Sequence, residues 1–234
     1  MTELITYIFE FITTILSFFA SLLLIKQKKD SQVPLGNMFL TLASSFVGIY
    51  ALSTIIYSII GQEWAVIVFL KLGMIAILMA VLLLYFTMQV LIYSSKWIKI
   101  HKLSFWVPLC TSLVISFVLV FTDYIIVIDA KTAETHFQPI PYTLFAIFVA
   151  FMLIYSTFSM YSFGIRKSTG NSRKRMQLFF IGLLFIIGSL IIDVLGNIIE
   201  NEVIFDTLLF TTLSLGIIFV AGAFYGKKRE IETG

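Results

Sequence analysis

Four ionisable side chains lie inside or at the edges of long apolar runs, and they are the residues whose types suit a functional site. These residues are Glu10, Lys71, Asp193 and Asp206. An ionisable group inside a bilayer is costly, so each one is by default a candidate for function. Three carboxylates and one amine leave surplus negative charge if all are ionised. That surplus favours a cation unless one of the carboxylates is protonated.

The four groups are expected at a similar depth in a membrane. Glu10 lies near the start of the first run, Lys71 near the start of the third, Asp193 near the end of the sixth and Asp206 near the start of the seventh. At 1.5 Å per helical residue, each is roughly 5 to 10 Å below the same surface. Polar neighbours at helical spacing extend the cluster. The predicted ligand-binding set is Glu10, Tyr57, Lys71, Asp193, Asn197 and Asp206.

Two interpretations of this cluster stay open. In the structural one, Lys71 pairs with Asp193 or Glu10, and the hydroxyls join neighbouring helices. In the functional one, the groups line a pocket for a small ligand. The sequence contains no hydrolase or metalloprotease motif. Its two histidines, His101 and His136, are expected on opposite sides of the membrane. We therefore predict no enzyme activity, no metal site and no cofactor.

The elements that position these residues are seven apolar runs. Hydrophobic residues make up 59% of the 234 residues and charged residues only 12%, whereas a soluble domain carries about 25% charged residues. A run of roughly 20 apolar residues spans a bilayer as a helix. The sequence thus predicts an all-α seven-transmembrane-helix bundle over 1–226. The predicted spans are 5–25, 38–60, 64–92, 103–121, 142–165, 176–199 and 203–225.

The basic residues predict how this bundle is oriented. Fourteen of the sixteen lysines and arginines fall in alternate gaps between the runs or in the tail 227–234. Because cationic loops stay in the cytoplasm during insertion, the N-terminus is expected outside and the C-terminus inside. The charge is then a topology signal that suits the anionic inner leaflet of the plasma membrane. It does not indicate a nucleic-acid partner.

One loop on the expected outer side differs from the others. Residues 122–141 join the fourth and fifth spans, and Ile125–Ile128 is β-branched throughout. Such a run followed by a turn predicts a short β-hairpin over the outer mouth of the bundle. The alternative is a disordered extracellular loop.

Several motifs between about residues 60 and 225 resemble a known family. They are WAVIVFLKLGM (Trp64–Met74), LLLYF (Leu82–Phe86), WVPL (Trp106–Leu109), the PIPY that ends the long loop and RKRMQLFFIG (Arg173–Gly182). Together they are similar to the seven-transmembrane N-terminal sensor region of bacterial and archaeal histidine kinases. The resemblance implies a receptor that passes a signal to a cytoplasmic output domain. Only nine residues follow Tyr225, so the expectation is either a stand-alone sensor or a piece of a longer protein.

The sequence thus predicts a receptor-like membrane sensor that detects an extracellular or membrane-borne small ligand. Its expected partners are the lipid bilayer, the unknown ligand and a cytoplasmic signalling partner at the basic loop 166–175 and the tail; a homodimer is left open. A ligand can switch such a bundle only by binding its two states differently. The alternative is a small seven-helix transporter or channel that uses the same pocket. A purely structural or assembly protein is a third interpretation.

Overall fold

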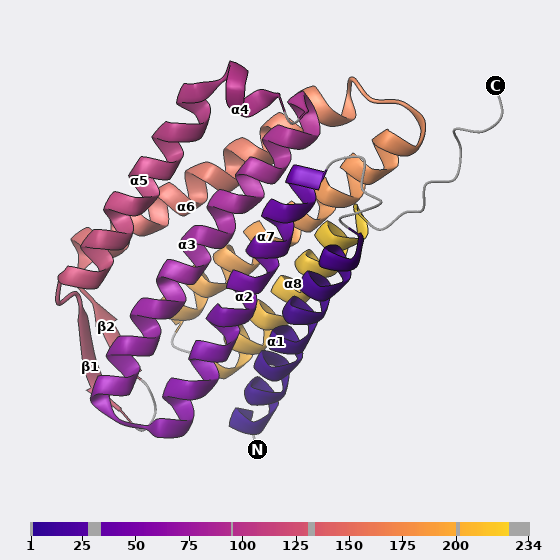
Figure 1. The fold of residues 1–234 in the computed structure, drawn as a ribbon. Coiled ribbons are helices and arrows are strands. Elements are labelled where there is room, and N and C mark those ends of the chain that lie inside the picture. The colour runs from indigo at the N-terminus through magenta and orange to yellow at the C-terminus, as the bar shows by residue number, and fades with distance from the viewer. Residues whose placement is uncertain (1, 28–33, 95, 131–133, 200–201, 225–234) are drawn as a thin grey trace.

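The computed structural model describes residues 2–27, 34–94, 96–130, 134–199 and 202–224, which form a helical bundle with one small hairpin (Figure 1). Seven of the helices in this described part are long and apolar enough to cross a membrane, as predicted. The elements are α1 (Thr2–Gln27), α2 (Pro34–Ile60), α3 (Glu63–Tyr93), α4 (Trp97–Ile100), α5 (Lys102–Phe121), β1 (Ile125–Asp129), β2 (Glu134–Phe137), α6 (Pro139–Ser159), a π-helical turn (Met160–Ile165), α7 (Gly170–Ile199) and α8 (Glu202–Gly222).

Each of the seven long helices begins before its predicted span, and the difference is largest for α2 and α7. Helix α2 begins at Pro34 and α7 at Gly170, four and six residues before the predicted spans. Proline is favoured in the first helical turn, where its missing N–H costs nothing. The first turns of α7 are polar and basic, so a search for apolar runs does not detect them. Hydrophobicity locates the part of a helix suited to hydrocarbon, and it misses polar helical ends.

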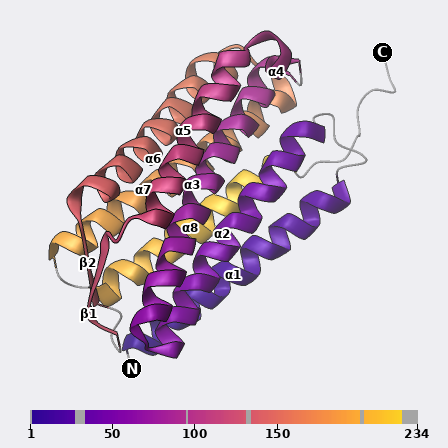
Figure 2. The ribbon, with the colours of Figure 1, turned by 60° about the vertical axis from the view of Figure 1, so that its left-hand side comes forward.

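Six of the long helices close a ring, and the seventh packs outside it. The order around the ring is α1, α2, α3, α6, α7 and α8, with α8 returning to pack on α1. Helix α5 lies beside α3 and α6 (Figure 2). It is the least buried of the seven spans. The tightest pairs join α3 to α2, α2 to α1, α1 to α8 and α8 to α7, whereas α6 packs less extensively on both of its neighbours. The ring is therefore least tightly packed at the two interfaces of α6.

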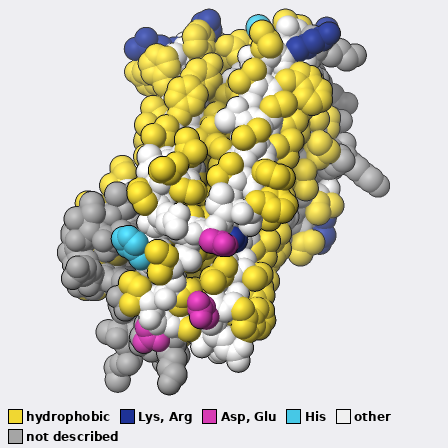
Figure 3. Space-filling view, turned by 90° about the vertical axis from the view of Figure 1, so that its left-hand side faces the viewer, with side chains coloured by type: hydrophobic (Ala, Val, Ile, Leu, Met, Phe, Trp, Pro, Cys, Tyr) yellow, Lys and Arg dark blue, Asp and Glu magenta, His cyan; other side chains and the backbone are white. Residues whose placement is uncertain are grey.

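The outer surface of the bundle is apolar around its sides. Large hydrophobic side chains such as Phe11, Phe117, Ile147 and Phe151 are more than half exposed. Figure 3 shows that hydrophobic side chains cover most of one face, with Lys and Arg gathered mainly at one end and Asp and Glu toward the other. A continuous apolar surface of this extent suits contact with lipid. The protein is accordingly a multi-pass membrane protein.

Polar side chains of α1 point into the ring. Glu10, Thr13, Ser17 and Ser21, which share one face of the helix, are all buried. The Thr13 hydroxyl lies 2.8 Å from the Ser214 hydroxyl of α8. Ser21 donates a hydrogen bond of 2.8 Å to the backbone carbonyl of residue 41 in α2. Helix α1 is thus held on both sides by hydroxyl groups that would be unsatisfied against hydrocarbon.

The segment that connects α5 and α6 contains a β-hairpin, and we call the end of the bundle that carries it the hairpin end. Strands β1 and β2 are antiparallel, with Ile125 opposite Phe137. The hairpin is anchored by Tyr124, which is fully buried and whose hydroxyl donates to the Met74 sulfur of α3 at 3.1 Å. Burial raises the pKa of the Tyr124 phenol well above its usual range, so the group remains a neutral donor.

Two glycines bring α7 and α8 into close contact. A Cβ added at Gly182 would lie 2.8 Å from the carbonyl oxygen of Gly216 and would collide with the Val220 side chain. A Cβ added at Gly216 would lie 3.1 Å from the carbonyl oxygen of Gly182. Close approach at small residues is a common way for membrane helices to associate. The two helices are therefore expected to move as one unit.

This contact predicts the effect of a single methyl group. Gly182→Ala should lower the free energy of unfolding by about 1–3 kcal/mol, because the backbones must separate to admit the methyl. Gly188→Ala on the same helix is the matched control, since a Cβ there meets no atom within 4 Å. The control should be neutral or slightly stabilising. The measurement is thermal unfolding of both variants in one detergent, and equal melting temperatures would contradict the close α7–α8 contact.

Candidate binding cavity

A cavity of about 470 Å³ lies inside the ring, at the hairpin end and reaching toward the middle of the bundle. Its lining comes from α1, α2, α3, α6, α7, α8 and β2, so every helix of the ring contributes. Helix α5, which packs outside the ring, does not contribute among the described residues. The volume falls within the usual range of pockets for small ligands, about 300–1,000 Å³.

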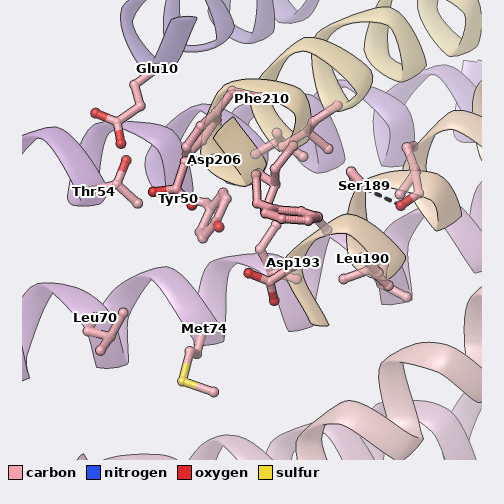
Figure 4. Close-up of a pocket in the computed structure, with 18 of the residues that line it drawn as sticks. Glu10, Tyr50, Thr54, Leu70, Met74, Ser189, Leu190, Asp193, Asp206 and Phe210 are labelled. Atoms are coloured by element: carbon pink, nitrogen blue, oxygen red, sulfur yellow. Dashed lines mark hydrogen bonds between the residues drawn. The ribbon is translucent and has the colours of Figure 1, made fainter. Parts of the chain in front are cut away.

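Three carboxylates from three helices line the hairpin end of this cavity. Glu10 lies near the start of α1, Asp206 near the start of α8 and Asp193 near the end of α7. Because α7 runs antiparallel to α8, the end of one helix lies beside the start of the other, and the acids converge (Figure 4). The structure thus brings these three predicted site residues together.

Glu10 is the most buried of the three acids. Its side chain is 5% exposed, and its Oε2 atom has no hydrogen-bond partner. It lies beside Thr54 of α2 and faces Asp206 of α8 (Figure 4). A buried carboxylate oxygen without a donor costs free energy. This oxygen is therefore a ready acceptor for a donor that enters the cavity.

One face of α2 adds aromatic and hydroxyl groups to the same end. Tyr50, Thr54 and Tyr57 follow helical spacing and all line the cavity, which places the predicted residue Tyr57 in the site. The Tyr50 ring stacks on Phe210 of α8, with 6.0 Å between ring centres. Tyr50 lies between Asp193 and Asp206 (Figure 4). The acids are thus separated by an aromatic side chain.

The other end of the cavity is apolar. It is formed near the middle of the bundle, where α3, α6 and α8 contribute only aliphatic side chains. We call this part the apolar arm and define it by Ile77, Val81, Leu84, Leu153 and Leu213. The cavity is therefore amphipathic along its length, with acids at the hairpin end and hydrocarbon at the inner end.

The hairpin and the start of α6 supply lining residues that the sequence did not single out. Thr135 and Phe137 of β2 line the cavity, as does Tyr142 of α6. The rings of Phe137 and Tyr142 stack with 4.9 Å between their centres. This stack joins the hairpin to α6 over the acidic end. The sequence signalled this segment by the run Ile125–Ile128 and by the PIPY motif around Tyr142, but it did not identify these three residues as part of a site.

Lys71 does not belong to this cluster, and its predicted pairing with Glu10 or Asp193 is not formed. Its Nζ donates to the backbone carbonyls of Val120 at 3.1 Å and Thr122 at 2.9 Å. It also lies 5.7 Å from the centre of the Tyr124 ring. The amine thus caps the C-terminal end of α5, where backbone carbonyls lack helical partners and the helix dipole attracts a cation. Lys71 does not line the cavity.

The last predicted site residue is only partly described. Asn197 lies in α7, but its side chain is outside the described residues. Four of the six predicted residues therefore meet in the cavity, namely Glu10, Tyr57, Asp193 and Asp206. Within the described part of the chain, no three His, Cys, Asp or Glu side chains approach closely enough to hold a metal ion. The four residues that meet in the cavity thus supply carboxyl groups and an aromatic hydroxyl that can bind a ligand.

Comparison with protein-family models, with curated proteins and with solved structures finds no match. The resemblance to histidine-kinase sensor regions therefore stays a prediction that rests on the quoted motifs.

The position of Lys71 predicts a structural effect. Lys71→Met should lower the free energy of unfolding by about 1–2 kcal/mol, because two carbonyls at the end of α5 lose a charged donor. Lys71→Arg keeps a cationic donor and should retain most of the stability. The measurement is thermal unfolding together with ligand binding to the cavity. Loss of binding in Lys71→Met with unchanged stability would instead place the amine in the binding site.

Proposed function

We propose that this protein is a receptor-like sensor of the plasma membrane that binds a small cationic ligand inside its helix ring. The observation that carries the proposal is the cavity, which collects three carboxylates and contains no lysine or arginine among its described lining residues. Acids that share a low-dielectric site with no basic side chain in its described lining favour a positively charged ligand. A site built only to join helices would be expected to be closely packed.

The charge pattern supports an orientation with the cavity toward the outside. Basic side chains gather at the end of the bundle opposite the hairpin end, in connections or in the first turns of α5 and α7: Lys96, Lys102, Arg166 and the cluster 173–175. Connections rich in lysine and arginine stay in the cytoplasm. The hairpin end, with its acids, then faces the outside, and a ligand reaches the cavity from there or from the outer leaflet.

The ring offers a route from the cavity to the cytoplasmic side. Helices α6 and α7 both line the cavity, through Tyr142 and Asp193, and their far ends are joined through the π-helical turn and residues 166–169. Helix α6 packs less extensively on its neighbours than the other ring helices do. A ligand that contacts α6 and α7 together therefore favours one relative position of these two helices. The basic segment 166–175, which comprises residues 166–169 and the first turns of α7, then presents the change to a cytoplasmic partner.

A cavity-filling variant tests the binding site. Ala80 of α3 lines the cavity, so Ala80→Leu should fold and should lose the ligand that the wild-type protein retains on purification with native lipids. Ala76→Leu, at a buried position of the same helix outside the cavity lining, should lose stability by about 1–3 kcal/mol. The measurements are mass spectrometry of the retained small molecules and thermal unfolding.

Flux across proteoliposomes separates the sensor from the transporter. The sensor proposal expects retained ligand, no flux of that ligand and a change in the distance between spin labels on the outward faces of α6 and α7 when ligand is added. Flux of the ligand would establish the transporter instead. Identical sets of retained molecules in wild type and Ala80→Leu would contradict a binding site in this cavity.

A further inference from the structure

We infer that the ligand of this cavity is an amphiphilic amine, with its ammonium group among the acids at the hairpin end and a hydrocarbon chain or ring in the apolar arm. This inference rests on the proposed function, because it specifies the chemistry of the same site. Three features of the cavity support it: the acids at the hairpin end, the way in which these acids are spaced, and the apolar arm.

The acids select a cation at the hairpin end. Glu10, Asp193 and Asp206 all line the cavity, and no lysine or arginine lines it in the described part of the chain. Lys71, which lies on a ring helix, is directed to the end of α5 by its bonds to two carbonyls. An anionic ligand would add charge of the same sign to this end. The buried, unpartnered Oε2 of Glu10 instead accepts a hydrogen bond from an N–H donor.

The spacing of the acids favours an organic cation over a metal ion. A metal ion needs several oxygen ligands within about 2.6 Å. The described residues contain no group of three acidic, His or Cys side chains that converge in this way. The acids come from three helices, and the ring of Tyr50 lies between two of them (Figure 4). An ammonium group carries its charge on a bulky, hydrogen-bonding centre and is attracted to aromatic faces.

The apolar arm selects a hydrocarbon part. Ile77, Val81 and Leu84 line it from α3, with Leu153 and Leu213 opposite on α6 and α8. A small hydrophilic cation such as methylammonium would leave this arm unfilled and would gain nothing from it. Each methylene placed there is removed from water and strengthens binding about fourfold. Chain length should therefore control affinity at constant charge.

The two ends fix the direction of the ligand. The acids lie near the ends of α1, α7 and α8 at the hairpin end, whereas Leu84 and Leu153 lie deeper in the bundle. An amine bound in this way points its chain toward the centre of the membrane, in the same sense as a lipid of the outer leaflet. The ligand thus has the orientation that it would adopt in the bilayer before it enters the ring.

The test is binding of a matched series of probes to the full chain in lipid nanodiscs, with empty nanodiscs subtracted. The probes are methylammonium, n-butylammonium, n-octylammonium, n-octanol and octanoate. We expect n-octylammonium to bind most tightly, with affinity rising about fourfold per methylene along the ammonium series. We expect n-octanol to bind at least about tenfold more weakly and octanoate weakest, because the acids attract only the ammonium group.

Two variants locate each half of the ligand. Glu10→Gln should weaken n-octylammonium binding by about tenfold to a hundredfold and leave n-octanol unchanged. Its matched control is Glu63→Gln, at an exposed acid of α3 that does not line the cavity. Ala80→Leu should weaken n-octylammonium more than n-butylammonium, because the added side chain occupies space near the arm.

The outcomes separate this inference from the proposal on which it rests. Equal affinity for n-octanol and n-octylammonium would overturn the choice of an amine, and equal affinity for methylammonium and n-octylammonium would overturn the hydrocarbon part. If no ammonium probe binds while the wild type still retains a native molecule that Ala80→Leu loses, the inferred ligand class is wrong and the binding site stands. If no ammonium probe binds and the wild type retains no molecule that Ala80→Leu loses, the inferred ligand class and the binding site are both wrong.

Discussion

The structure depends on the absence of water around its sides. A bilayer core offers no hydrogen-bond partner, so every polar side chain on a spanning helix must find one inside the protein or line a cavity. This constraint turns the Glu10–Ser21 face of α1 inward and places the acids of α7 and α8 in the same interior. It also leaves Phe117, Phe151 and similar side chains on the outside. The ring of six helices is the arrangement in which these faces meet.

The cation and the acids satisfy this constraint in different ways. Lys71 has a flexible stem, and its amine reaches the carbonyls at the end of α5, which are unpaired within that helix. The carboxylates have short side chains and remain on the inner faces of their own helices. The protein therefore uses its membrane-embedded lysine to fix α5 and the hairpin, and it leaves the acids in the cavity. Because Lys71 is bound at the end of α5, it does not neutralise the acids that line the cavity.

Much of the fold could be predicted from the sequence because hydrophobic length is a strong signal. The seven long helices and the strand at Ile125–Ile128 follow directly from apolar and β-branched runs. The acids at the site could be predicted because ionisable residues in such runs are rare. Tyr57 could be predicted because it lies on a polar face with Tyr50 and Thr54. Each of these signals depends on residue type alone or on spacing within one helix.

The position of Lys71 could not be predicted, because depth along a helix does not give direction around it. Leu70 lines the cavity, but Lys71 is turned from it by about 100° and reaches α5. Helix α3 is apolar on almost every face, so no polar stripe showed which face points inward. The apolar arm could not be predicted either. A leucine that lines a cavity and a leucine that fills a core are the same letter in a sequence.

Because α6 packs less extensively than the other ring helices, a ligand in the cavity can affect the packing of the whole ring. Five helices form a tightly packed chain from α3 through α2, α1 and α8 to α7, and α6 closes it with less extensive packing. The cavity borders that closure, with Asp193 of α7 and Tyr142 and Leu153 of α6 in its lining. A ligand that fills both ends supplies contacts that the helices do not make with each other. Its binding free energy is therefore coupled to the two interfaces of α6 with α3 and α7, which are the least extensive in the ring.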